Sequence, residues 1–301
     1  MKMKIAKHIF WLTFFGLVFF YACEKEITVD LPKPDPKIVV EGYVFEGERP
    51  YVILSRNTGY FEPIDSASLI NSFIFDGVVT VSDGINTDTL TFQSAAESVL
   101  GFAYVKTNPT VVGQAGKTYT LTATADGQTV TAVTTIIPPL ALDSILWKPQ
   151  VNEDSLGFVW IYFTDPGVDL RGYRIMSRRV SANPERNQPY FRTNFYFENS
   201  LFSGQQAPVG FDQASQYGED LLANQPEDPD DGYFRVGDTV EVRLCTIDKP
   251  YYDFLNMLGN STSSNGSPFA SPNNVIGNVI GGLGGFGGHG VAQYRIVCTF
   301  P

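Results

Sequence analysis

The sequence predicts a mostly β protein with two folded domains. Short apolar runs of strand length recur between residues 38 and 247, turn dipeptides separate them, and one later segment has helical periodicity. Pro138 and Pro139 interrupt the series, because two residues without N–H groups cannot continue a central strand. The predicted domains are therefore residues 38–140 and residues 141–301.

The N-terminal segment, residues 1–22, has the parts of a secretory signal: a head with three lysines, an apolar run over residues 9–22 and a small residue, Ala22, before the cut. The fourteen residues of that run reach only about 21 Å as a helix, less than the ~30 Å hydrocarbon core of a bilayer. Because Cys23 follows Ala22 directly, we expect a lipoprotein signal cleaved before Cys23, with acyl chains on that cysteine. The alternative is a soluble secreted protein with a chance cysteine at its cleavage site.

Residues 23–37 contain three prolines and predict an extended tether between the lipid and the first domain. Loss of the three signal lysines would change 21 basic and 32 acidic residues to 18 and 32, a formal charge of −14 instead of −11. That balance argues against nucleic acid or an anionic surface as the main partner.

The first domain, residues 38–140, has β signals throughout. Residues 38–44 and 51–55 are β-rich runs, and Asp83-Gly84 is a turn dipeptide. Asp126-Gly127, flanked by alternating apolar residues, predicts a tight hairpin, because this pair accepts the positive φ angles of a type I′ turn. Several short strands at this spacing predict an Ig-like β-sandwich.

The second domain, residues 141–301, is β-rich with one short helix and a Gly/Asn-rich loop. The helix is predicted over residues 250–258, capped by Asp248 and ended by Gly259. Its apolar face is expected to pack on the second sheet. That face consists of Tyr251, Phe254, Leu255 and Leu258.

With Cys23 assigned to lipid, Cys245 and Cys298 remain, and both lie in strand-like runs. One interpretation is a disulfide that joins two strands of one sheet. The other is a pair of buried free thiols that act as small apolar residues.

The tract after the helix is unusual, since eight of the fourteen residues 277–290 are glycine. Glycine loses the most entropy on ordering, so such a tract is either flexible or held in a conformation that other residues cannot adopt. One interpretation is a docking or capture loop, and the equal alternative is a structural segment along a sheet edge. The candidate docking residues are Phe269, Asn274, Leu283, Phe286 and His289.

Several C-terminal motifs resemble a lipoprotein family of Bacteroidota known as domain of unknown function 4249 (DUF4249). The motifs are Gly237-Asp238-Thr239-Val240, Ile247-Asp248, Ser267-Pro268-Phe269 and Gly281-Gly282-Leu283-Gly284. The resemblance covers nearly the whole chain and includes Asp165-Pro166-Gly167. It implies an outer-membrane location beside a TonB-dependent receptor, and Glu24 and Glu26 loosely resemble a surface-export signal. It supplies no catalytic residues.

Catalytic and metal signals are weak. The sequence has no G-x-S-x-G or H-E-x-x-H motif, and its two histidines cannot form a multi-histidine metal site. An acidic loop offers a calcium candidate at Asp228, Asp230 and Asp231, but it lacks EF-hand spacing, which favours a solvated turn. Turns and caps account for the remaining carboxylates considered, Asp143, Asp165, Asp169 and Asp248. We therefore expect no enzyme activity and no cofactor.

Three functional hypotheses follow. The first is an accessory outer-membrane lipoprotein, facing outward, that docks on a TonB-dependent transporter and assists cargo capture or gating. The second is a stand-alone glycan- or peptide-binding lipoprotein with aromatic stacking residues, for which strand burial is the alternative explanation. The stacking candidates are Trp160, Tyr190, Phe191 and Tyr196. The third is a hydrolase with an unrecognised carboxylate pair.

Overall fold

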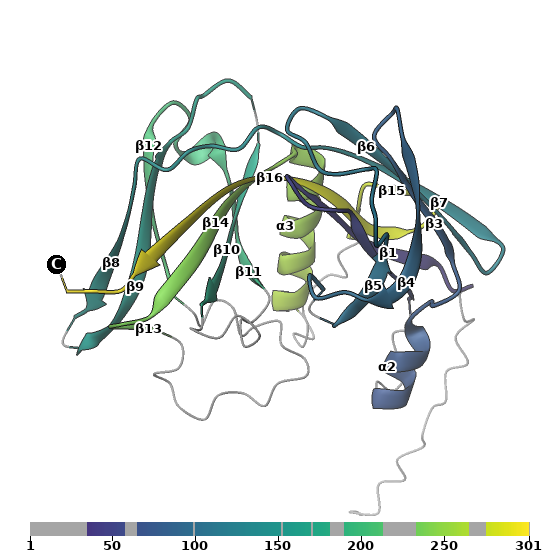
Figure 1. Cartoon of the computed structure of the whole chain (residues 1–301), viewed down its shortest axis with the longest axis horizontal. Helices are drawn as coiled ribbons and strands as arrows, with labels where there is room; N and C mark the ends of the chain where they lie inside the picture. Colours follow the sequence, from purple (N-terminus) through teal and green to yellow (C-terminus); the bar gives the residue numbers. More distant parts are fainter. Residues whose placement is uncertain are drawn as a thin grey trace, which may run out of the picture. The chain divides into compact units, whose positions relative to one another are not determined.

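A single strand, β16 (Leu283–Val297), runs through both lobes of the fold. The computed structural model describes residues 35–57, 65–98, 100–151, 153–169, 171–180, 190–212, 233–264 and 275–300. Residues 36–301 form one compact unit, to which the following description applies. Within it, twelve strands form one sheet, in which β16 lies between β14 (Thr239–Ile247) and β1 (Ile38–Phe45). Figure 1 shows β16, in yellow, extending from the first lobe into the second.

The first lobe is one sheet that curls round its own core. Its other strands are β2 (Tyr51–Arg56), β3 (Val78–Ser82), β4 (Thr87–Ser94), β5 (Phe102–Val105), β6 (Thr118–Ala125), β7 (Gln128–Thr135) and β15 (Val279–Ile280). They follow β16 in the order β1-β2-β5-β4-β3-β6-β7-β15. The last strand of this order, β15, is separated from β16 by only two residues, Gly281 and Gly282. The two ends of the curled sheet therefore meet at β16.

A seam of side-chain hydrogen bonds joins β7 to β16 where this series closes. The Asn278 amide group donates to the carbonyls of Val133 (3.1 Å) and Phe286 (2.7 Å) and accepts from the Phe286 N–H (2.9 Å). The Gly288 N–H on β16 donates to the Thr134 hydroxyl on β7 at 2.7 Å. These bonds satisfy backbone groups that would otherwise lack a strand partner at the seam.

The mostly β prediction is confirmed, but the Ig-like sandwich is not. The first lobe is a continuous curled sheet, and β1 pairs in parallel with β16. The lobes do not coincide with the predicted domains 38–140 and 141–301. Val279 and Phe286, which follow the strands of the second lobe in the sequence, belong to the core of the first lobe. The Asp126-Gly127 hairpin is confirmed, with φ angles of 52° and 72° between β6 and β7.

The second lobe packs two sheets face to face. One layer contains β11 (Phe191–Glu198), β10 (Gly172–Arg179), β14 and β16. The other contains β12 (Gln206–Phe211), β9 (Glu153–Thr164), β13 (Phe234–Arg235) and β8 (Ser144–Gln150), with β8 on the opposite edge of β9 from β12 and β13. Their shared core includes Trp147, Phe163, Tyr173 and Phe234.

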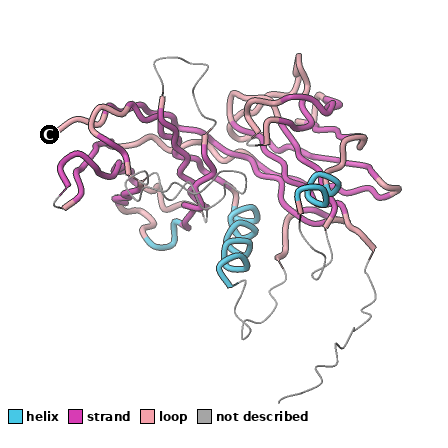
Figure 2. The backbone as a smooth tube through the Cα atoms, turned by 90° about the horizontal axis from the view of Figure 1, so that it is seen from below, coloured by secondary structure: helices cyan, strands magenta, loops and turns pink. Residues whose placement is uncertain are grey.

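Helix α3 (Lys249–Ser264) lies between the two lobes in both views (Figure 1, Figure 2). The shorter helix α2 (Ser66–Ser72) lies in the first lobe, and a 3-10 turn, η2 (Asn199–Leu201), lies in the second. Helix α3 begins as predicted, since the Asp248 carboxylate accepts from the Tyr251 N–H at 3.0 Å. Tyr251 and Leu255 are buried against β1, β2 and β14, whereas Leu258 is 41% exposed.

The predicted helix end at Gly259 is wrong, because α3 continues to Ser264. A terminating glycine adopts a positive φ angle, and Gly259 is not among the glycines that do. A Cβ at this position would instead lie 2.0 Å from the Tyr196 hydroxyl oxygen. Gly259 therefore provides space for the close packing of α3 on β11.

Most of the glycine tract, residues 283–290, belongs to the central strand β16, whose two faces are both approached closely by other parts of the chain. A Cβ at Gly287 would lie 2.4 Å from the Tyr251 ring of α3, and one at Gly285 would lie 2.5 Å from the Phe254 ring. On the other face, a Cβ at Gly290 would lie 2.0 Å from the Ile137 carbonyl oxygen. The structural interpretation of this tract agrees with the structure, since residues 279–280 form β15 at the end of the sheet and residues 283–290 belong to the central strand β16.

We predict that Gly287→Ala will destabilise the fold by more than about 2 kcal/mol, since the added methyl group must displace Tyr251 from a packed interface. Gly47→Ala is the control, because Gly47 has open space around it and only its positive φ angle opposes a side chain, at about 1–2 kcal/mol. Urea unfolding measures both. Equal losses in the two variants would contradict the packing argument.

Candidate functional sites

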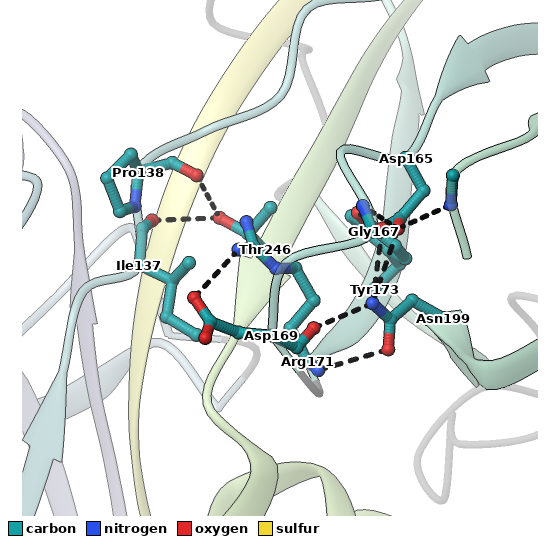
Figure 3. Close-up of polar contacts among 10 residues, drawn as sticks. Ile137, Pro138, Asp165, Gly167, Asp169, Arg171, Tyr173, Asn199 and Thr246 are labelled. Carbon is teal, nitrogen blue, oxygen red and sulfur yellow. Dashed lines mark hydrogen bonds and ion pairs between the residues drawn. The ribbon is translucent and has the colours of Figure 1, made fainter.

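A buried carboxylate, Asp165, organises the turn that follows β9 (Figure 3). Its Oδ1 accepts from the Gly167 N–H at 2.7 Å, and its Oδ2 accepts from the Tyr173 hydroxyl at 2.5 Å. The Asn199 amide donates to both oxygens at 3.3–3.4 Å and to the Asp169 carbonyl at 2.7 Å. The Asp165-Pro166-Gly167 motif thus acts as the centre of a hydrogen-bonded turn.

The Asp165 side chain is an ionised carboxylate whose hydrogen bonds stabilise the turn. Burial alone would raise its pKa, but the hydrogen bonds from Tyr173, Gly167, Gly204 and Asn199 outweigh burial and lower the pKa. The carboxylate is therefore charged at neutral pH and its lone pairs are directed at fixed donors. Tyr173 shows the reciprocal effect, because burial and the neighbouring carboxylate raise the pKa of its hydroxyl.

A second buried carboxylate, Glu241 of β14, holds three side chains together on the sheet face turned away from the core of the second lobe. Its oxygens accept from Arg178 at 2.7 Å, from Arg295 at 2.5 Å and from the Tyr190 hydroxyl at 2.9 Å. The Arg243 guanidinium lies 3.8 Å from the Tyr190 ring centroid and pairs with Glu48 of the first lobe at 2.6 Å. This cluster therefore links the two lobes.

The other carboxylates that the sequence analysis considered are also engaged. Asp143 accepts from the Thr164 hydroxyl and the Gln206 amide at 2.8 Å each, and Asp169 lies 3.5 Å from Arg171. Over the described ranges, no group of three or more His, Cys, Asp and Glu side chains is placed to hold a metal ion. The calcium candidates Asp228, Asp230 and Asp231 lie outside the described residues.

The docking-loop prediction is wrong for the residues that the structure describes. Phe286 and His289 are fully buried within β16, and Leu283 begins that strand. The His289 ring stacks on Phe45 with centroids 4.4 Å apart. A sheet interior cannot serve as a free loop. Phe269 and Asn274 lie outside the described residues.

Of the two interpretations of Cys245 and Cys298, the structure agrees with the buried free thiols and not with the disulfide, because both cysteines are free and buried. They do lie on adjacent strands, as expected. In the β14–β16 ladder, however, Cys245 pairs with Val291, whereas Cys298 follows Val297, the partner of Thr239. Seven residues along β16 therefore separate Cys298 from the position opposite Cys245, about 24 Å at ~3.4 Å each, and a disulfide requires Cα atoms within about 7 Å.

The aromatic stacking candidates have different surroundings. Tyr190 lies between the guanidinium groups of Arg178 and Arg243, and Tyr196 contacts Tyr252 of α3 with ring centroids 6.2 Å apart. Trp160 instead lies on the outer face of β9, beside Lys148. The side chain of Phe191 lies outside the described residues.

An exposed aromatic cluster that the sequence analysis missed lies on the first lobe. Four phenylalanine rings contact one another in pairs, with centroids 4.8–5.4 Å apart. They are Phe73, Phe75, Phe92 and Phe102, which we call the phenylalanine patch. Phe75 is 44% exposed and Phe92 is 36% exposed, and α2, which ends just before Phe73, also exposes Leu69 and Ile70. No local sequence pattern unites these rings, because they come from separate elements.

The architecture defines a two-lobed β protein whose lobes share one glycine-rich central strand. The sequence matches the family described as domain of unknown function (DUF4249) over residues 24–295, and the chain belongs to that family. A comparison with curated proteins found no match. The predicted signal and Cys23 lie outside the described residues, and no described helix is long and apolar enough to cross a membrane.

We predict that Cys245 and Cys298 will be protected in the folded protein and free in the unfolded one. In a chain that begins at Glu24, a thiol-reactive dye should find two thiols in denaturant and none under native conditions, since both side chains are buried. Burial raises the pKa of each thiol to about 12, which further suppresses the reactive thiolate. A count of zero in denaturant without reductant would mean that a disulfide exists.

We predict that Glu241 contributes stability that acid removes. Burial would raise its pKa, but the hydrogen bonds from Arg295, Arg178 and Tyr190 lower it from 4.5 to about 2. Its contribution is therefore full above pH ~4.5 and is lost as the pH falls toward ~2. Between pH 6 and pH 3, the free energy of unfolding should fall by about 2 kcal/mol less in Glu241→Gln than in the wild type.

Urea unfolding at several pH values measures this difference. Asp169→Asn is the matched control, because the Asp169 side chain is 78% exposed and its contact with Arg171 is long. Parallel pH profiles for the wild type and Glu241→Gln would contradict the role given to Glu241.

Proposed function

We propose that this protein is an outer-membrane-anchored accessory lipoprotein, exposed at the cell surface, that docks on a TonB-dependent transporter and assists cargo capture or gating. The observation that carries the proposal is the phenylalanine patch. Aromatic side chains are enriched at the centres of protein interfaces, where they contribute most of the binding energy. Four clustered rings that remain partly exposed therefore favour a protein partner.

The patch lies beside the start of β1, because Phe73 pairs with Ser55 and the next residue, Arg56, pairs with Ile38. Lys37 and Asn57 exchange backbone and side-chain hydrogen bonds at the start of β1 and the end of β2. The neighbouring Arg56 donates to the Phe73 carbonyl at 3.3 Å. The expected tether, residues 23–37, spans at most about 50 Å when fully extended. A lipid on Cys23 would thus keep the patch within reach of a membrane-bound partner.

Charge favours a protein over an anionic surface as the occupant of the patch. The whole chain has a formal charge of −11, and Arg56, which donates to the Phe73 carbonyl, is paired with Asp126 at 2.7–2.9 Å. Exposed Asp76 follows Phe75 directly. The rim therefore offers mixed charge around an apolar centre, the usual composition of a protein interface. The family resemblance supports a transporter as the partner.

We predict that Phe75→Ser/Phe92→Ser will lower the amount of TonB-dependent transporter that co-purifies with the tagged lipoprotein from native outer membranes by about tenfold or more. The substitutions remove the two most exposed rings of the patch, so the anchor and the sheet should be retained. Mass spectrometry of the purified complex measures the transporter, and thermal unfolding verifies the fold.

The matched control is Ile85→Ser/Val151→Ser, which removes two apolar side chains that are more than 80% exposed and lie in other turns. This control should recover the transporter in wild-type amounts. Recovery of no transporter by the wild type would overturn the proposal. Equal recovery by the wild type and the phenylalanine variant would exclude the patch as the docking surface.

A further inference from the structure

One edge of β16 has no strand partner along its last part. Strand β1 pairs with this edge only as far as His289, and β16 continues to Val297 with β14 along its other edge (Figure 1). The first N–H that points to this edge after the end of β1, that of Val291, donates to the Glu46 carboxylate at 3.2 Å. The protein thus satisfies one donor of the edge with a side chain, and the edge continues beyond it.

Three further residues direct their backbone groups to this edge. The Cys298 N–H donates to the carbonyl of the residue that precedes β14 at 2.8 Å, whereas the Val291 N–H points to the opposite side. Because the backbone groups of successive strand residues point to alternate edges, those of Gln293, Arg295 and Val297 point away from β14. Among the described residues, none bonds to the N–H or C=O groups of these three. The edge therefore offers three donors and three acceptors.

The edge strands of the other sheet in the second lobe contain a feature that this edge lacks. Proline opposes the addition of a strand, because it has no N–H to donate. Strands β12 and β8, which lie on opposite edges of β9, contain Pro208 and Pro149. Residues 291–297 of β16 contain no proline. This edge can therefore pair with a strand of another chain.

Arg295 determines which kind of strand fits the edge. Its side chain is 60% exposed and lies on the sheet face that carries the Glu241 cluster. Arg178 and Arg243 lie on the same face, so three guanidinium groups stand against two carboxylates, Glu241 and Glu48. This part of the surface carries an excess of positive charge although the whole chain has a formal charge of −11. Acidic side chains are therefore favoured beside Arg295.

We propose that residues 293–297 of β16 bind an extended acidic segment of another protein, which adds to this edge as a strand. The acidic side chains of that segment lie beside Arg295 on the outer face of the sheet. Its alternate, apolar side chains lie on the inner face, where the partly buried Ile296 packs on the core of the second lobe. In this mode of binding, main-chain hydrogen bonds supply affinity and alternate side chains supply specificity.

Charge favours an acidic strand of another protein over a second copy of this chain. A two-fold pairing of two β16 edges centred on Arg295, the middle of the three residues, would place two arginines opposite each other. Like charges in that position destabilise a sheet. The edge belongs to the second lobe, whereas the phenylalanine patch belongs to the first. The inference therefore goes beyond the proposed docking through the patch and does not depend on it.

The test measures the binding of two fluorescently labelled decapeptides to the detergent-solubilised full-length protein by fluorescence anisotropy. One peptide alternates valine and glutamate, and the other alternates valine and lysine. We expect the glutamate peptide to bind with a Kd below about 100 μM and the lysine peptide to bind at least about tenfold more weakly. Because Arg295 is exposed, added salt should reduce this difference.

Two variants test the backbone and the charge separately. Val297→Pro removes one N–H of the free edge, retains the bonds between β16 and β14 on the opposite edge, and should weaken binding of the glutamate peptide by about tenfold. Arg295→Ala retains every backbone group and should weaken that binding by about threefold. The control, Lys117→Ala, removes a cation of the first lobe that is paired with Asp83 and should bind as the wild type does. Thermal unfolding verifies the fold of each variant.

Several outcomes would overturn the proposal. They are no binding of the glutamate peptide at about 1 mM, equal binding of the two peptides, or unchanged affinity in either variant. Self-association of the wild type that Val297→Pro abolishes would assign the edge to a second copy instead. The Phe75→Ser/Phe92→Ser variant should bind the glutamate peptide normally, because its substitutions lie in the first lobe. This variant separates failure of the β16 edge from failure of the docking proposal.

Discussion

The structure depends on the close approach of other elements to both faces of one strand. The rings of Tyr251 and Phe254 contact β16 from α3, and the Val40 and Ile137 carbonyls contact it from the first lobe and the segment after β7. Only glycine leaves room for contacts on both faces at once. Because β16 pairs with β1 at one end and β14 at the other, the same strand completes the curled sheet of one lobe and the sandwich of the other.

The sequence predicted local structure well where short-range chemistry decides it. The Asp126-Gly127 hairpin and the Asp248 cap of α3 need only their own neighbours in the chain. The glycine tract resembled a loop because its composition indicates flexibility, whereas its conformation is set by Tyr251 and Val40, which are distant in sequence. The disulfide prediction identified adjacent strands but not their register, and the register is set by the whole β14–β16 ladder.

The candidate sites also differ according to whether neighbouring or distant residues in the sequence form them. The structural role expected for Asp165 agrees with its contacts, because Asp165-Pro166-Gly167 forms its turn locally. The phenylalanine patch had no sequence signal, since its rings come from three places between residues 73 and 102 and meet only in the folded lobe. For Trp160, the sequence left ligand stacking and strand burial open, and its place on the outer face of β9 came from the structure. The close contact of its ring with Gly210 also required the structure.

The parallel pairing of β1 with β16 joins the first described strand to the last. Contacts of such long sequence separation form late and slowly, because a large loop must close before they stabilise the chain. Neither lobe can complete its sheet until residues 283–297 are available. A nascent chain therefore cannot reach its native state before residues 283–297 have been made. The same topology makes unfolding cooperative, so a loss at the last strand propagates to both lobes.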